Sequence, residues 1–300
     1  MTRQDDGLKS EALLAALNEA LAGKYARLED LLGRHGNMPS PKPNLKLAQA
    51  FGAELASAGG QVVQLLKRFT ADDAAPDTAQ VFLPIAASHG WVHRLREHRD
   101  VEPAWAALEE LCADERGPVR VGAADALVAL ASREGWADKL VERAGQWLQS
   151  EDRELRFGAA ALVVEVLGHK LVMAGVRDGA ALLAYLAGVI DSIADAPRAA
   201  ERSEGRRRAL TSLSLALPTI VASLRADDQG LTWLLAECER NAHPDVRRVL
   251  SDTIVKLHEK GETAGALSLR AALVASAKPL RDPTLVRKGT GRGKQTRRTR

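Results

Sequence analysis

The sequence predicts an all-α chain in which helical hairpins follow one another as an α-solenoid. Hydrophobic residues make up 46% of the chain and many of them are alanine, the strongest helix former, whereas aromatic residues make up only 4%. No run of alternating β-branched residues predicts a strand. The stretch 117–130 (GPVRVGAADALVAL) has a near-copy at 153–166 (RELRFGAAALVVEV), which places Val119 and Leu155 at equivalent positions 36 residues apart. A repeat period of about 20–50 residues is typical of solenoids.

Further copies of this motif are found on both sides. Leu83 begins an earlier copy and Val246 begins a later one. Between them, Arg206 takes the position of Leu155 after an interval of 51 residues. That interval contains the polar segment 194–205, and such an insertion is tolerated because closure entropy grows slowly with loop length.

Residues 1–77 are predicted to form four less regular helices that cap the array, as terminal solenoid units do. Their apolar residues recur at helical spacing, and Asn44 is placed to cap the third helix. The segments 38–44 and 70–78, rich in proline and small polar residues, interrupt the helices. The four expected helices span 8–22, 24–34, 44–57 and 60–69.

The repeat array is expected over residues 78–277, with its last helix at 262–277. Pro279 and Pro283 follow that helix and end the regular structure. The remaining segment, 278–300, is predicted to be a disordered basic tail because it lacks the apolar residues that a packed structure needs.

Charge is distributed unevenly along the chain. The net charge is +3, yet residues 287–300 hold seven Lys or Arg and no acid, which leaves −4 on residues 1–286. Flexible basic segments attract nucleic acid by releasing counterions, and they also attract acidic protein surfaces. The tail is therefore a candidate binding segment for nucleic acid or for an acidic partner. Its basic residues are Arg287, Lys288, Arg292, Lys294, Arg297, Arg298 and Arg300.

Each repeat is predicted to be a helix, a turn and a second helix. A small hydrogen-bonding residue stands six positions before the arginine of each clear motif, where it can cap the second helix or close the turn. Cys112 and Cys238 end the first helices of two pairs and are interpreted as buried packing residues. The paired positions are Asp114 with Arg120, Ser150 with Arg156, and Asn241 with Arg247.

The stretches ADERGPVRVGAADALVAL, SEDRELRFGAAALVVEV and NAHPDVRRVLSDTIVKL resemble HEAT repeats. The resemblance is clear over 102–170 and 229–260 and weaker over 78–98 and 205–224. It implies a right-handed α-solenoid of about six or seven helix pairs. It also implies that the repeated arginines bind the inter-helix turn of a neighbouring repeat, which is a structural role and not a binding ladder. HEAT-like proteins include scaffolds, transport adaptors, enzyme regulators, bilin-lyase subunits and alkylated-base glycosylases, so the resemblance leaves the function open.

One predicted helix face carries the side chains of His89, His93 and Glu97 at spacings of four residues. Two histidines at this spacing hold zinc in some enzymes. Here Gly90 stands where such a motif needs its general base, and no third histidine or cysteine completes the ligand set. We therefore expect no metal or other cofactor, and a solvated polar face with Trp91 turned inward.

The sequence favours binding over catalysis. No Ser/His/Asp or Cys/His arrangement is visible, so we expect a non-enzymatic scaffold or adaptor that docks a protein partner through exposed residues of the second helices. The alternative is a nucleic-acid-binding protein related to alkylated-base DNA glycosylases, with an acid such as Asp125 or Asp252 and aromatic residues facing a basic groove. The net charge of −4 on residues 1–286 opposes this alternative. The aromatic candidates are Trp91, Trp105, Trp136, Trp147 and Trp233.

The chain is expected to be cytoplasmic and to have no contact with a membrane. Charged residues stand where a signal peptide needs an apolar core, and no stretch reaches the about 18 uncharged apolar residues that a membrane span needs. The two cysteines are 126 residues apart and form no C-x-x-C motif, so neither a disulfide nor a zinc ribbon is expected.

Overall fold

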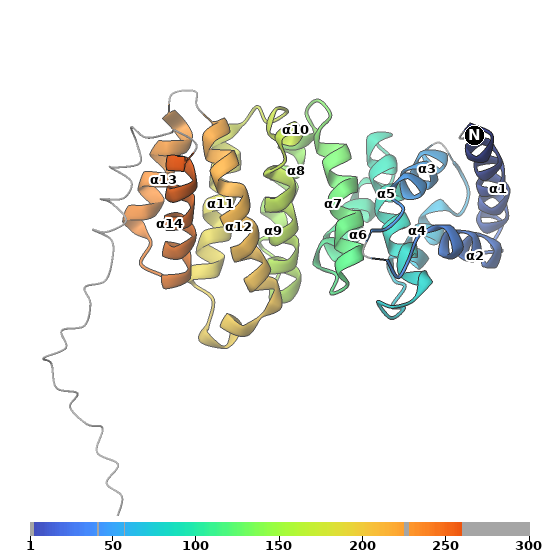
Figure 1. The fold of residues 1–300 in the computed structure, drawn as a ribbon, viewed down its shortest axis with the longest axis horizontal. Coiled ribbons are helices and arrows are strands. Elements are labelled where there is room, and N and C mark those ends of the chain that lie inside the picture. Colours follow the sequence, from blue (N-terminus) through green and yellow to red (C-terminus); the bar gives the residue numbers. More distant parts are fainter. Residues whose placement is uncertain (1–2, 41, 57, 225–227, 260–300) are drawn as a thin grey trace, which may run out of the picture.

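A computed structural model describes residues 3–40, 42–56, 58–224 and 228–259. Within these residues the regular structure consists of 14 α-helices and two short 3-10 helices, with no strand, which confirms the predicted all-α class. Figure 1 shows the helices following one another in chain order from α1 to α14. None of these described helices is long and apolar enough to cross a membrane. The predicted helix 262–277 and the predicted tail 278–300 lie outside the described residues.

The four helices expected in residues 1–77 are present, and the first begins earlier than predicted. The side-chain oxygen of Asn44 accepts a hydrogen bond from the Leu47 amide at 3.2 Å, which confirms the predicted cap. These helices are α1 (Arg3–Leu21), α2 (Ala26–His35), α3 (Leu45–Leu55) and α4 (Val62–Thr70).

From residue 79 onward the chain alternates between two sets of helices, and α3 from the N-terminal part of the chain also belongs to the first set. In the first set, α3 contacts α5, and contacts then pass in chain order to α7, α9, α12 and α14. Helices α6, α8, α11 and α13 pack against that set. The first set continues after α3 with α5 (Phe82–Arg96), α7 (Gly117–Ala131), α9 (Arg153–Leu167), α12 (Glu204–Ser223) and α14 (Pro244–Glu259). The second set is α6 (Val101–Ala113), α8 (Trp136–Trp147), α11 (Gly179–Ala194) and α13 (Gln229–Arg240), and the short elements are η1 (Ala79–Val81), α10 (Lys170–Met173) and η2 (Arg198–Arg202).

One continuous apolar core extends through the described helices from α1 to α14. The repeated positions of the sequence take equivalent places at its edge. Val119, Leu155 and Val246 are each the third residue of their helix, and Arg206 is the third residue of α12. Val119 and Val246 are buried, and Leu155 is partly buried. The spacing of the motif therefore predicts the register of these four helices.

The two cysteines are packing residues, as predicted. Cys112 near the end of α6 and Cys238 near the end of α13 are both fully buried free thiols. Burial raises the pKa of both thiols, that of Cys238 to about 11, because a thiolate is poorly solvated there.

Two of the repeated arginines, Arg120 and Arg156, bind the turn of their own hairpin. Arg120 Nη1 donates to the carbonyl oxygens of Asp114 and Glu115, each at 2.7 Å. Arg156 Nη1 donates in the same way to the carbonyl oxygen of Ser150 at 2.9 Å. The expectation that these arginines bind the turn of a neighbouring repeat was wrong for both, because each side chain folds back over the turn that precedes its helix.

The small residues of the turns act differently from one another. The Asp114 side chain accepts a hydrogen bond from the Arg116 amide at 2.8 Å, as a residue that closes a turn should. The Asn241 side chain donates to Glu237, both to its backbone carbonyl at 3.1 Å and to its carboxylate at 2.8 Å. Asn241 therefore stabilises the end of the preceding helix α13.

Asp152, and not the predicted Ser150, caps α9. Its Oδ1 accepts hydrogen bonds from the amides of Glu154 at 2.9 Å and Leu155 at 3.1 Å. Asp152→Ala is therefore expected to lower the free energy of unfolding by about 1 kcal/mol, because two helical N–H groups lose their acceptor. Chemical denaturation measures this change. Glu151→Ala, at the exposed neighbouring position, is the control and should change the free energy by less than about 0.5 kcal/mol; equal effects would contradict the cap.

Helix α5 is covered on nearly all sides, so the predicted solvated face is wrong. His89 is only 1% exposed, because α3 and α7 both pack against α5. At Gly52 of α3 the two backbones come so close that a Cβ would lie 2.7 Å from the His89 carbonyl oxygen. Trp91 is buried as predicted, and its Nε1 donates to Thr70 Oγ1 at 2.9 Å. Glu97, just beyond the last turn of α5, is the exposed member of the predicted face.

Candidate functional site

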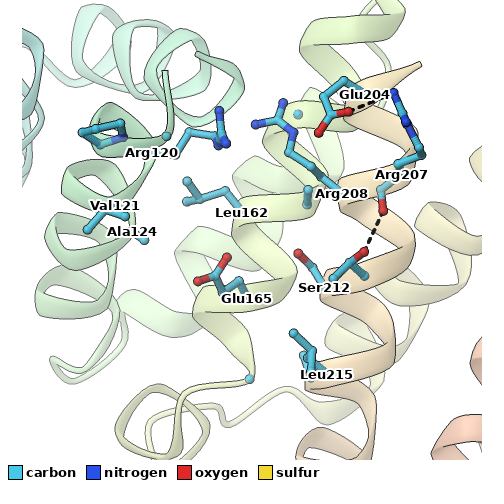
Figure 2. Close-up of a pocket in the computed structure, with 17 residues that line it drawn as sticks. Arg120, Val121, Ala124, Leu162, Glu165, Glu204, Arg207, Arg208, Ser212 and Leu215 are labelled. Atoms are coloured by element: carbon cyan, nitrogen blue, oxygen red, sulfur yellow. Dashed lines mark hydrogen bonds and ion pairs between the residues drawn. The ribbon is translucent and has the colours of Figure 1, made fainter. Parts of the chain in front are cut away.

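A groove of about 850 Å³ crosses α9, with α7 on one side and α12 on the other (Figure 2). We call it the α7–α9–α12 groove. Parts of the segments 117–124, 158–168 and 204–216 line it. Small residues bring its floor and one wall close together: a Cβ at Gly168 would lie 2.7 Å from the Cβ of Ala216. The helices themselves therefore form the groove, and no loop has to fold over it.

Two large apolar side chains are exposed on opposite walls of the groove. Val121 of α7 is 46% exposed and Leu215 of α12 is 67% exposed. Leu162 of α9 lies between these walls, and Ala161 of α9 also lines the groove. Apolar side chains that surround one hollow are typical of surfaces that bind another molecule.

Two arginines meet at one end of the groove. Figure 2 shows Arg120 of α7 and Arg208 of α12 pointing toward each other. The Arg208 side chain passes α9 at Gly158, where a Cβ would lie 3.0 Å from Arg208 Nη2. Burial and the charge of Arg120 lower the pKa of Arg208, and its buried Nε and Nη1 have no hydrogen-bond partner among the described residues. An anion bound between the two guanidinium groups would offset the repulsion between Arg120 and Arg208.

The carboxylates near Arg208 are engaged with other cations. Glu204 pairs with Arg207 at 3.0 Å, and Asp114 binds the Arg116 guanidinium through both oxygens, at 2.9 and 2.7 Å. Both favour the charged form of Arg208 electrostatically, but neither accepts a hydrogen bond from it. This end of the groove therefore keeps an attraction for anions.

The groove is lined by arginines, carboxylates, hydroxyl groups and apolar side chains. The described residues that line the groove include no histidine, cysteine or lysine, so its hydroxyl groups have no base of those kinds beside them. Thr211 Oγ1 donates to the Arg207 carbonyl at 3.0 Å, within its own helix. The arginine end and the apolar walls together suit an anionic group beside an apolar one.

The histidines considered as metal ligands lie outside this groove, between α3, α5 and α7. His89 Nε2 lies 3.5 Å from Asp125 Oδ2, an oxygen that accepts a hydrogen bond from Gln49 Nε2 at 2.9 Å. Burial lowers the pKa of His89 to about 4, with a smaller effect of His93. Burial, reinforced by Arg96, lowers the pKa of His93 to about 4 as well. In the part of the chain that the structure describes, no group of three or more His, Cys, Asp or Glu side chains is arranged to hold a metal ion.

Most aromatic residues of the glycosylase alternative belong to the core. Trp91, Trp105 and Trp147 are at most 6% exposed. Trp136 is partly buried and stacks on His98, with ring centroids 5.9 Å apart. Buried indole rings cannot stack on a nucleobase, as an aromatic binding platform must.

Sequence reasoning singles out one of the main residues of the groove. Arg120 is among the repeated arginines, whereas Val121, Arg208 and Leu215 belong to no predicted site. A run of three arginines at the start of a helix, residues 206–208, was the available signal, because three adjacent cations cannot all be buried in a core. The seven basic tail residues, which the sequence predicts to bind a partner, lie outside the described residues.

Comparisons with known proteins give no match: no protein-family model, no curated protein and no solved structure matches this chain. The resemblance to HEAT repeats stays a prediction from the sequence. The functional interpretation therefore depends on the geometry of the α7–α9–α12 groove.

Proposed function

We propose that the chain is a non-enzymatic scaffold or adaptor of the HEAT-like, right-handed α-solenoid type, which docks a protein partner in the α7–α9–α12 groove. The chain-order packing of the helices supports this proposal, because stacked helical hairpins leave a long continuous surface on which partners can lie.

A single observation carries the proposal: Val121 and Leu215 are exposed on opposite walls of one groove. A side chain that is 67% exposed gains little from the fold of its own chain, whereas burial of the same surface by a partner contributes about 25 cal/mol per Å² of apolar area. The basic tail residues 287–300 would add attraction for an acidic partner, since opposite charges steer two proteins together.

The proposal predicts that Leu215→Glu abolishes partner binding. The full-length chain, immobilised as wild type and as variant, is used to capture proteins from the cell of origin, and retained proteins are quantified by mass spectrometry. Proteins that the wild type enriches should be retained at least about tenfold less by Leu215→Glu, because a carboxylate would have to be buried in the interface.

Leu14→Glu is the matched control, because Leu14 is 38% exposed on α1, outside the groove. It makes the same chemical change and should leave the captured proteins unchanged. Circular dichroism checks that both variants fold. Equal capture by the wild type and by Leu215→Glu would reject the groove as the docking surface.

The competing interpretation is that the chain binds nucleic acid and is related to alkylated-base DNA glycosylases. Fluorescence anisotropy with a short duplex DNA and a single-stranded RNA, at several salt concentrations, separates the two. Replacing the seven tail cations with glutamine should abolish any binding seen, because the rest of the chain carries a net charge of −4. Steeply salt-dependent binding that survives this replacement would favour the competing interpretation.

A further inference from the structure

The α7–α9–α12 groove has two chemically different parts. At one end, Arg120 and Arg208 approach each other from opposite walls (Figure 2). Farther along, exposed Val121 and Leu215 flank a floor of small and apolar residues. A ligand that fits both parts carries a negative charge and an apolar group at a fixed separation.

The two arginines are available to different degrees. Arg120 uses Nη1 for the carbonyl oxygens of the turn at Asp114 and Glu115. Arg208 makes no hydrogen bond or ion pair to any described residue, and its Nε and Nη1 are buried. A carboxylate between the two guanidinium groups would give Arg208 a countercharge and would reduce the repulsion between the two cations.

The carboxylates of the chain itself do not fill this place. Glu204 is paired with Arg207 at 3.0 Å. Glu154 lies near enough to favour the charged form of Arg208. Its Oε2, however, accepts a hydrogen bond from the Gly205 amide at 3.4 Å. The basic tail of the chain carries the same sign of charge as the two arginines, so it is repelled from this end of the groove.

We propose that the α7–α9–α12 groove recognises an acidic peptide segment of the partner protein. Its carboxylate binds between Arg120 and Arg208, and an apolar side chain of the same segment packs between Val121 and Leu215. This inference depends on the proposed function, because it specifies the chemistry of the partner that the groove docks.

The distance between Arg208 and Leu215 along the α12 wall sets the spacing of the two peptide groups. Leu215 follows Arg208 by seven residues on α12, which is about 10 Å along the helix axis. An extended peptide covers that distance in about three residues. An acid followed or preceded by an apolar residue about three positions away is therefore the expected motif, or about seven positions away if the segment is helical.

A nucleic-acid strand fits this groove less well than an acidic peptide. Phosphates repeat along a strand and need cations along their whole path. Here the cations stand at one end only. Farther along the groove come Val121, the carboxylate of Glu165 and, at the far end, Leu215. The apolar walls add favourable contacts only if the ligand has an apolar side chain to bury.

Selection from a random peptide library displayed on phage tests the inference with the full-length chain. The wild type should enrich peptides with Asp or Glu and an apolar residue at the expected spacing. Selection on Arg208→Gln should keep the apolar residue and lose the acid, and selection on Leu215→Ser should do the reverse. If the peptides selected on each variant still contain one of the two groups, the acid or the apolar residue, the variant is folded.

Affinities of one enriched peptide give the size of the effect. Arg208→Gln should weaken its binding at least about tenfold, which corresponds to the loss of a charge-assisted hydrogen bond. Arg153→Gln, which removes an exposed cation of α9 that does not line the groove, should leave the affinity unchanged. Acid enrichment that is the same on wild type and Arg208→Gln would overturn the inference.

Two other outcomes are also decisive. If partner capture depends on Leu215 but is unchanged in Arg208→Gln, the acidic-peptide inference fails and the proposed docking function stands. If a short duplex DNA binds the full chain and Arg208→Gln weakens that binding tenfold, the arginines bind phosphate and the inference is overturned.

Discussion

Replacing Asp245 with asparagine is expected to lower the free energy of unfolding by about 2–3 kcal/mol. The reason is the position of its partner: Arg206 of α12 is only 2% exposed, and its Nη2 lies 2.8 Å from Asp245 Oδ2 at the start of α14. The same Nη2 lies farther, at 3.5 Å, from the carbonyl oxygen of Ile193. Without the carboxylate, a buried guanidinium would have to stay charged with little compensation, and the contact between α12 and α14 would weaken.

Replacing the other partner of the pair, Arg206, shows whether the loss comes from an unpaired buried charge or from a lost packing contact. Arg206→Met removes the buried charge and leaves Asp245 half-exposed to water, so it should cost far less than Asp245→Asn. Asp191→Asn is the matched control, because its ion pair with Arg240 is exposed on both sides and should contribute less than about 1 kcal/mol. Chemical denaturation of the three variants gives the comparison. Equal losses for Asp245→Asn and Asp191→Asn would show that Arg206 is solvated in solution.

Arg206 also shows which features of the structure the repeat pattern predicts and which it does not. The motif places it at the position of Leu155 and Val246, and it is indeed the third residue of its helix. The same pattern predicts an apolar residue there. The arginine is tolerated because a carboxylate from the next hairpin neutralises it, and a spacing along one chain contains no information about which side chain of a later helix comes within reach.

The groove could not be predicted for a related reason. Helix positions, turns and register follow from local spacing, and these agree with the structure over most of the described chain. The exposure of Val121 and Leu215 depends instead on how closely α7, α9 and α12 approach one another. That distance is set by the sizes of facing residues such as Gly168, just after α9, and Ala216 of α12, where a Cβ added to the glycine would lie 2.7 Å from the alanine Cβ. The burial of His89 against Gly52 has the same origin.

Lowering the pH from about 6.5 to about 4 is expected to destabilise the chain, with His89 alone contributing about 3 kcal/mol. Burial lowers the pKa of His89 from 6.5 to about 4 in the folded state, and Asp125 only partly offsets this effect. Well above pH 6.5 the side chain is neutral in both states and the pH has no effect through it. As the pH falls below 6.5 the unfolded chain binds the proton first, so stability is lost progressively until the folded state is protonated as well, near pH 4. His93, whose pKa is also lowered to about 4, adds a loss in the same direction.

Urea denaturation at a series of pH values measures this slope. His89→Gln removes the titrating group while keeping a polar side chain, so its free energy of unfolding should fall less between pH 6.5 and pH 4 than that of the wild type. His169→Gln, which removes an exposed histidine just after α9, should reproduce the wild-type slope. The comparison uses slopes and not absolute stabilities, so it remains informative even if the substituted glutamine packs less well than the native imidazole. A wild-type slope in the His89→Gln variant would mean that water reaches this histidine, and that α3 does not close against α5 at Gly52 as the structure has it.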